Sequence, residues 1–285
     1  MSYDLYFTGS TISHEQFQDY FRNRHFYQLG DNQAVYENED TGVYFIFDYS
    51  EPEEESQSGL SLNLNYFRPH FFGMEAEPEV HNVVRHFKFQ IDDPQNEGMG
   101  QGNYSSEGFL RGWNAGNAFA YQAMLRQEGS RGDVAFMSKK ELQACWEWNF
   151  NKARVQSDLG DSIFVPRHFY MRVNGQVKSA AVWPDVIPAL LPHVDVFLVA
   201  RHMFAPKRFF FFKGEDICLV PRADAQNLLD PYETADYALP AYKLDFPTPP
   251  ENFASFAKSL SPFADPLEGI SMDRLLNQEL ADGVV

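Results

Sequence analysis

Residue types that often carry out catalysis occur in this sequence without the spacing that catalysis requires. The sequence contains no GxSxG, HExxH or CxxC motif, so it lacks the familiar arrangements for a nucleophilic serine, a zinc-bound water or a redox dithiol. His25, His70, His168 and His202 each lie beside aromatic or other apolar residues, where a lone histidine more often has a structural role. We therefore predict no catalytic residue.

Two weaker patterns suggest a phosphate loop and a metal site, and neither is complete. Gly98–Gly102 precedes a predicted helix, but Asn103 replaces the last glycine of GxGxxG and no Lys-Ser or Lys-Thr pair follows. Glu77 and His81 lie four residues apart on a predicted helix, and a metal needs more ligands than this pair. The oxygen-rich stretch 92–97 does not match an EF-hand loop. We predict neither a metal nor a cofactor.

Acidic residues of the first third of the chain form the remaining candidate site. The net charge is −17, and the first hundred residues, with 18 acidic and 5 basic residues, contribute −13 of it. Such a surface repels nucleic acids and anionic membranes and attracts basic proteins. It therefore predicts a docking surface for a basic protein partner, although acidic residues can also simply keep a protein soluble. The predicted binding residues are Glu37, Glu39, Asp40, Glu51, Glu53, Glu54, Glu55, Asp92, Asp93 and Glu97.

These acidic residues fall on loops of a predicted small antiparallel sheet. Residues 34–36 and 42–49 favour a hairpin, and residues 60–66 alternate between apolar and polar side chains, as a half-buried strand does. Residues 13–24 and 78–87 have the apolar spacing of helices. Together they predict an α+β module in which the loops between strands present the carboxylates.

Two consecutive helices are predicted in the middle of the chain, between Ser105 and Asp158. Gly108, Gly112 and Gly116 recur every fourth residue along the first helix. Each internal glycine destabilises a helix by about 0.8–1.0 kcal/mol relative to alanine, so this stripe predicts close packing against another element. The second helix begins at Ser138, which forms a predicted capping box with Glu141.

A second strand-rich module is predicted after the helices. Asn174-Gly175 is a strong hairpin signal. The fold class is therefore α+β, with two strand-rich modules that have antiparallel sheets and flank the helical pair, and with boundaries at 1–102, 103–160, 161–266 and a polar helix or tail at 267–285. After the hairpin the pattern predicts helices over 185–191, 222–229 and 250–260 and strands over 195–200, 208–212 and 217–220.

Cysteine usage and hydropathy predict a cytoplasmic protein. Cys145 and Cys218 are far apart in apolar contexts, which favours two reduced thiols over a disulfide. The N-terminal residues do not resemble a signal peptide, and no apolar run reaches the roughly 18 residues of a membrane span. The sequence leaves open whether the chain forms a homodimer.

Several stretches resemble an uncharacterised family of bacterial proteins. They are YENEDTGVYF at 36–45, LNYFRPHFFGMEAEPEV at 64–80, GFLRGWNAGN at 108–117 and VWPDVIPALLPHVD at 182–195. The family is similar to the immunity proteins of type VI secretion and polymorphic-toxin loci, which act in interbacterial competition. The resemblance implies a cytoplasmic inhibitor that binds and occludes a cognate toxin made by its own cell, with a restriction-endonuclease-like nuclease as the expected toxin. It supplies no catalytic motif.

Two functions are therefore open. The first is a non-enzymatic immunity protein. The second is an enzyme of unknown reaction with a site in a cleft between the two modules, where His168, Asp185 and His202 are the candidate groups. A cluster of titratable groups in a deep pocket favours the enzyme, whereas a broad acidic face favours the inhibitor.

Overall fold

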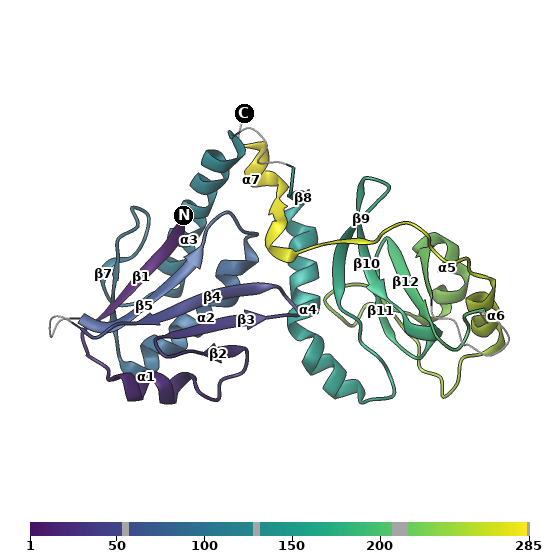
Figure 1. Ribbon diagram of the computed structural model, residues 1–285, viewed down its shortest axis with the longest axis horizontal. Helices are drawn as coiled ribbons and strands as arrows, with labels where there is room; N and C mark the ends of the chain where they lie inside the picture. The colour runs from purple at the N-terminus through teal and green to yellow at the C-terminus, as the bar shows by residue number, and fades with distance from the viewer. Residues whose placement is uncertain (53–56, 128–131, 207–215, 284–285) are drawn as a thin grey trace. The chain divides into compact units, whose positions relative to one another are not determined.

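The computed structural model describes residues 1–52, 57–127, 132–206 and 216–283 (Figure 1). The chain divides into two units. The first unit combines Met1–Leu142 with Met272–Val285, and the second unit is Gln143–Ser271. The second unit is thus inserted into the first in chain order. The mixed α+β class is confirmed, whereas these two units differ from the four predicted segments.

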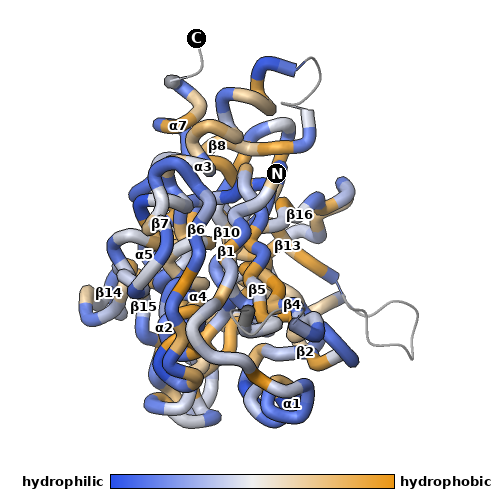
Figure 2. The backbone as a smooth tube through the Cα atoms, turned by 90° about the vertical axis from the view of Figure 1, so that its left-hand side faces the viewer, coloured by the Kyte–Doolittle hydropathy of each residue, from blue (hydrophilic) through white to orange (hydrophobic). Residues whose placement is uncertain are grey.

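The first unit contains a seven-stranded antiparallel sheet. Apolar and polar residues alternate along its strands, so every second side chain enters the core. In Figure 2 hydrophobic residues colour β4 and β5, whereas α1 is mostly hydrophilic. The strands, in spatial order, are β2 (Tyr27–Leu29), β3 (Gln33–Asn38), β4 (Val43–Tyr49), β5 (Gln57–Asn65), β1 (Ser2–Thr8), β6 (Gln90–Asp93) and β7 (Gly100–Gly102).

Three helices, α1 (His14–Phe21), α2 (Phe71–Phe87) and α3 (Ser106–Leu125), pack against one face of this sheet. Phe17 of α1 stacks on Tyr49 of β4, with ring centroids 5.5 Å apart. The hydroxyl of Tyr36 on β3 donates to Glu75 of α2 at 2.9 Å, and α3 lies against Tyr3 of β1. All of these sheet residues are buried, so the opposite face of the sheet carries none of these helices.

Helix α2 begins earlier than its sequence indicates. The apolar spacing predicts a helix over 78–87, but the helix begins at Phe71 and Pro78 lies inside it. Phe71, Phe72 and Ala76 are fully buried. Their packing outweighs the loss of one intrahelical hydrogen bond at the proline.

The glycine stripe of α3 is packed as predicted. A Cβ atom on Gly108 would lie 2.4 Å from Cγ of Met99, and one on Gly116 would lie 2.2 Å from the hydroxyl of Tyr66. At Gly112 it would lie 3.0 Å from Cα of Gly98. The three glycines therefore let the 95–99 loop and the Tyr66 ring approach the helix closely.

The end of the chain returns to the first unit, and the stretch predicted as a polar helix or tail contains a short helix that is preceded by strands. After the short helical turn η3 (Met272–Arg274), strand β17 (Leu275–Asn277) pairs in parallel with β8 (Ala135–Met137), and α7 (Gln278–Asp282) follows. Asn277 is buried and accepts from the backbone N–H of His70 at 2.8 Å, while its own N–H bonds to the Tyr121 hydroxyl at 3.0 Å. Leu275 and Leu276 are also buried.

The second unit has a five-stranded sheet and a smaller three-stranded one. Between the central strands β10 and β12 the pairing is parallel, and the other pairs of the larger sheet are antiparallel. The larger sheet, in order, is β13 (Asp216–Pro221), β12 (Val196–Arg201), β10 (Gln176–Val182), β9 (His168–Val173) and β16 (Glu268–Ile270); the smaller is β11 (Leu190–Pro192), β15 (Ala241–Lys243) and β14 (Glu233–Thr234).

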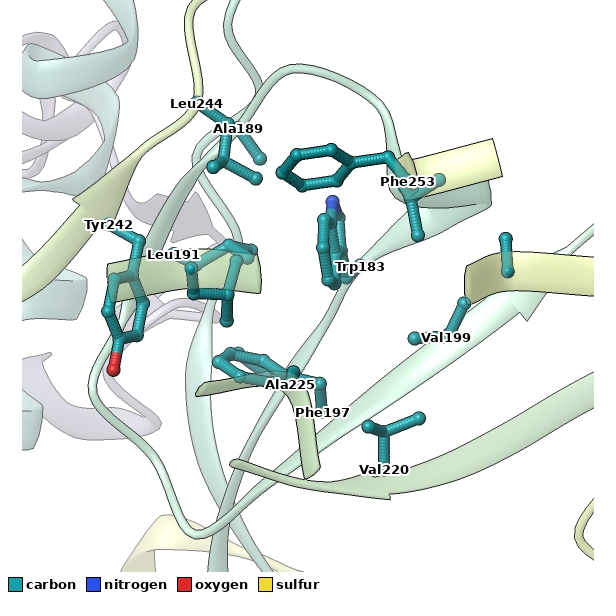
Figure 3. Packing of buried hydrophobic residues seen from close by; sticks show 14 of the residues in the cluster. Trp183, Ala189, Leu191, Phe197, Val199, Val220, Ala225, Tyr242, Leu244 and Phe253 are labelled. Atoms are coloured by element: carbon teal, nitrogen blue, oxygen red, sulfur yellow. The ribbon is translucent and has the colours of Figure 1, made fainter. Parts of the chain in front are cut away.

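The core of this unit surrounds Trp183 (Figure 3). The Trp183 ring makes edge contacts with Phe197 of β12 and with Phe253 of α6 (Glu251–Ser259), and its Nε1 donates to the carbonyl of Ile187 at 3.0 Å. Helix α5 (Arg222–Leu229) and the short η2 (Asp230–Tyr232) complete the layer of helices. The indole thus combines a large buried surface with a satisfied polar group.

Other predictions for the second unit have mixed outcomes. The helix predicted over 185–191 is wrong, because Pro184–Val186 is a short turn (η1) and β11 follows it. Pro188 and Pro192 interrupt any helix there. The hairpin at Asn174-Gly175 and helices α5 and α6 are confirmed, and the strand predicted over 208–212 lies outside the described residues. Cys145 and Cys218 are buried free thiols, as predicted.

The two central helices do not form a separate module. Helix α3 belongs to the first unit, whereas α4 (Lys139–Leu159) begins in the first unit and continues into the second. The predicted capping box at the start of α4 is present, since Ser138 N donates to Glu141 Oε2 at 3.1 Å and Glu141 N donates to Ser138 Oγ at 3.2 Å. Helix α4 therefore carries the chain from the first unit into the second, and the chain returns at Met272.

Candidate functional site

The open face of the seven-stranded sheet gathers carboxylates that are distant in sequence. In β1, β3, β4 and β6, every second side chain enters the core and the others lie on this face. The carboxylates among them are Asp4, Glu37, Asp48 and Asp92. Tyr6, which is 50% exposed, lies among them, directly opposite Asp92 across the β1–β6 pair. We call Asp4, Glu37, Asp48, Asp92 and Tyr6 the acidic sheet face.

Each of the four carboxylates accepts a hydrogen bond from a side-chain amide on a neighbouring strand. The closest pairs are Asn63 with Asp4 at 2.6 Å and Gln33 with Asp48 at 2.7 Å. The corresponding amides of Gln28 and Gln101 donate to Glu37 at 3.1 Å and to Asp92 at 3.2 Å. An amide orients a carboxylate without neutralising its charge.

Strands β1 to β7 contain neither lysine nor arginine. The carboxylates are therefore held in place without a cation on the same strands, and Arg68, which follows β5, donates to the hydroxyl of Tyr44, the residue opposite Glu37. A surface with four oriented anions and a half-exposed tyrosine can bind a basic protein surface, because complementary charge speeds association and fixes register.

A buried network positions the hairpin turn that carries Glu39 and Asp40. Glu75 of α2 is 2% exposed, and its Oε1 accepts from Asn38 Nδ2 at 2.8 Å and from Thr41 Oγ1 at 2.9 Å, besides Tyr36. These bonds tie both ends of the β3–β4 turn to the helix. Sequence reasoning missed Glu75, although a glutamate flanked by the apolar residues of an amphipathic helix is a recognisable sign of a buried carboxylate.

The structure distributes the predicted binding residues over several places. Glu37 and Asp92 belong to the acidic sheet face. Glu39 and Asp40 lie in the β3–β4 turn, Glu51 follows β4, and Glu97 lies in the β6–β7 loop, all at least partly exposed. Glu53, Glu54 and Glu55 lie outside the described residues.

Asp93 does not belong to a docking surface. It is 3% exposed, and its carboxylate accepts from the Tyr3 hydroxyl at 2.6 Å and from the backbone N–H groups of Met99 at 2.9 Å and Gln95 at 3.1 Å. Burial, together with the bond to Asp93, raises the pKa of Tyr3. Asp93 thus fixes the 95–99 loop against the sheet and α3.

The candidate groups for an enzyme have structural surroundings. Asp185 is buried, with a positive φ of 45°, and its Oδ1 accepts from the backbone N–H groups of His202 at 2.9 Å and Met203 at 2.8 Å. His168 is buried on β9, where burial lowers its pKa to about 4. In these bonds Asp185 contacts the backbone N–H of His202. The enzyme alternative stays a prediction.

Two features of the described residues bear on other site types. Within residues 1–52, 57–127, 132–206 and 216–283, no three His, Cys, Asp or Glu side chains come together as metal ligands would. In the same ranges, no helix is long and apolar enough to cross a membrane.

Comparisons with known proteins found no match: no family model, no curated protein and no solved structure is similar to this chain.

Proposed function

We propose that this protein is a non-catalytic inhibitor that binds a basic protein partner through the acidic sheet face of its first unit. The observation that carries this proposal is the set of four carboxylates on one open sheet face, each oriented by an amide and none accompanied by a cation on the same strands. Oriented charges of one sign attract a partner of the opposite sign over roughly 10 Å at ordinary ionic strength.

The partner in this proposal is a nuclease toxin made by the same cell. A nuclease must present positive charge to hold a phosphate backbone, so an acidic sheet can cover the same surface. The resemblance of residues 36–45, 64–80, 108–117 and 182–195 to immunity proteins favours a toxin over other basic partners. Inhibition by occlusion requires only binding, and it takes place in the cytoplasm, where the toxin would otherwise act.

Co-expression tests the proposal. The product of the adjacent gene is expressed in a host with the wild-type protein, with the variant Glu37→Lys/Asp48→Lys, or with Asp224→Lys/Asp265→Lys. The last pair reverses two exposed acids of the second unit, so its net charge matches that of the test variant. We expect the wild type and the second-unit variant to protect the host, and the sheet variant to protect it poorly.

Two results would contradict the proposal. Full protection by Glu37→Lys/Asp48→Lys, with correct folding of all three proteins, would exclude the acidic sheet face as the binding surface. Absence of any complex between the wild type and the adjacent gene product, together with turnover of a small metabolite, would exclude the inhibitor itself.

A further inference from the structure

A groove of about 630 Å³ runs beside the acidic sheet face in the first unit. One wall is a single face of α3, formed by Gly112, Ala115, Gly116 and Phe119 at helical spacing. The other walls are the start of β1 with Tyr66, and residues 95–97 of the β6–β7 loop. The volume lies within the range of pockets that hold small ligands or protein anchor residues.

The walls of the groove are fixed by internal bonds. Tyr66 donates to Gln95 Oε1 at 3.2 Å, which joins two walls. Arg111 of α3 donates to the backbone carbonyls of Glu97 and Gly98, both at 3.0 Å. Arg111 does not line the groove itself, and its bonds hold the loop on the helix.

The lining combines exposed apolar surface with carboxylates. Phe119 is 65% exposed, which is unusual for a phenylalanine on a helix that otherwise packs well, and Met1 is 62% exposed. Asp4 and Glu97 bring two carboxylates, Met1 brings the positive charge of its α-amino group, and the lining contains no lysine or arginine. Polar side chains of Ser2, Gln95 and Asn96 complete it. The groove therefore combines exposed apolar surface with an excess of one negative charge.

We infer that the groove receives a segment of the protein partner that places an arginine or lysine side chain beside an apolar one. The inference rests on the proposed function and states what the partner brings to this edge of the surface. The aliphatic stem of such a side chain packs against Ala115, beside the filled glycine positions, while its cation reaches Asp4 and Glu97. The neighbouring apolar residue covers Phe119, which is otherwise left in solvent.

Asp4 connects the groove with the acidic sheet face. Its Oδ1 accepts from Asn63 in the sheet and its Oδ2 from Ser2 at 3.0 Å, and it also lines the groove. One basic partner can therefore contact the acidic sheet face and insert an anchor side chain into the groove at its edge. Binding energy at protein interfaces is concentrated in such anchors, among which arginine is frequent.

Blocked peptides test the groove without the partner. Backbone amide resonances of the full chain are followed by NMR during titration with acetyl-Leu-Arg-Leu-amide, acetyl-Leu-Glu-Leu-amide or N-acetyl-argininamide. We expect saturable shifts at Gly112, Ala115, Gly116 and Phe119 with the first peptide only. Shifts of equal size with the acidic peptide, or no shifts at these residues, would overturn the inference, as would equal affinity for N-acetyl-argininamide, which would indicate a site for free cations.

Three variants localise the binding. Ala115→Phe fills the groove and should abolish the shifts, whereas Asn114→Phe, on an exposed neighbouring position of α3 that does not line the groove, should leave them unchanged. The surface change Glu97→Gln should weaken binding about three-fold, as expected for a partly solvated ion pair. Unchanged affinity in both Ala115→Phe and Glu97→Gln would overturn the inference.

The groove and the proposed function can fail separately. If the adjacent gene product binds the wild type but the Leu-Arg-Leu peptide shifts nothing in the groove, the inference fails and the proposed function stands. If the peptide binds in the groove and the gene product forms no complex, the inference about basic segments stands and the toxin is the wrong partner.

Discussion

His168 is buried, and its ring has no hydrogen-bond partner within the part of the chain that the structure describes. Its backbone N–H donates to Asn149 Oδ1 at 2.9 Å and its carbonyl accepts from Asn149 Nδ2 at 2.7 Å, which fixes the start of β9 on α4. Among the described residues, neither ring nitrogen has a partner. The neutral ring is therefore favoured in the folded state, and burial lowers the pKa of His168 to about 4.

This shift predicts a loss of stability in acid. Between the unfolded pKa, roughly 6.5, and about 4, the unfolded chain binds a proton at His168 that the folded chain does not, so stability falls as the pH falls. The contribution is about 1.4 kcal/mol per pH unit across that window and vanishes above it. Urea denaturation of the wild type and of His168→Gln between pH 5 and pH 8 measures it; parallel curves for the two proteins would contradict the assignment.

At the same scale, the acidic residues show how much of the candidate site could be predicted from the sequence. Charge counting identified the acidic first third of the chain, and alternation in β4 could have added Asp48, which follows the buried Phe47. Asp4 lies between the buried Tyr3 and Leu5 in the same way. Asp93 could not be separated from Asp92, because its burial depends on Tyr3, ninety residues away in the sequence.

At the scale of an element, the surroundings of helix α3 account for its glycine stripe. Gly112 faces the backbone of Gly98 and the ring of Tyr3, while Asn114, two residues later, is exposed. One helix therefore has a face without room for side chains and a solvated face. The periodicity of the sequence was sufficient to predict this packed stripe, although it did not identify the loop and ring that pack there.

Substitutions on the two faces should differ in their effect on stability. Gly112→Leu should lower the free energy of unfolding by about 1–3 kcal/mol, because the side chain enters a filled space next to backbone atoms. Asn114→Leu should change it by less than about 0.5 kcal/mol, as is usual for surface positions. Thermal and urea denaturation give both values, and equal stability of the two variants would refute the packing of this stripe.

The elements that the sequence misplaced share a physical cause. Tertiary packing of Phe71 and Phe72 extends α2 in front of Pro78, where local rules predict a helix start. Around Pro184–Val186, the positive φ of Asp185 and Val186 is set by contacts with distant strands, among them the bonds from His202 and Met203. Local periodicity contains neither kind of information.

At the scale of the whole molecule, the chain leaves the first unit in α4 and comes back to it at Met272. Asn277 makes the hydrogen bonds that join the returning segment to the first unit. Besides its bonds to His70 N and the Tyr121 hydroxyl, its Nδ2 lies 2.9 Å from His70 Nδ1. The sequence does not reveal this role, because β17 is only three residues long and lies in a stretch that was predicted to be a polar helix or tail.

Removing that side chain should weaken the first unit selectively. Asn277→Ala leaves the His70 N–H without its acceptor in a buried position, which costs about 1–3 kcal/mol. Amide hydrogen exchange should therefore accelerate in β8, β17 and the start of α2, and stay unchanged in the strands of the second unit. Uniform acceleration across both units would show that they unfold together and would contradict this division of the chain.

The central claim is that the acidic sheet face captures a basic partner by charge, and the association rate constant with the adjacent gene product tests it most directly. Stopped-flow mixing at low and high salt compares the wild type with Asp4→Asn/Glu37→Gln/Asp48→Asn/Asp92→Asn. A control of equal charge change, Asp161→Asn/Asp224→Asn/Asp245→Asn/Asp265→Asn, alters exposed acids of the second unit only.

The wild type and the control should associate about ten-fold or more slowly at high salt than at low salt, because screening removes electrostatic steering. The sheet variant should associate slowly at both salt concentrations. A wild-type rate that does not depend on salt, or a sheet variant that behaves like the control, would contradict the claim.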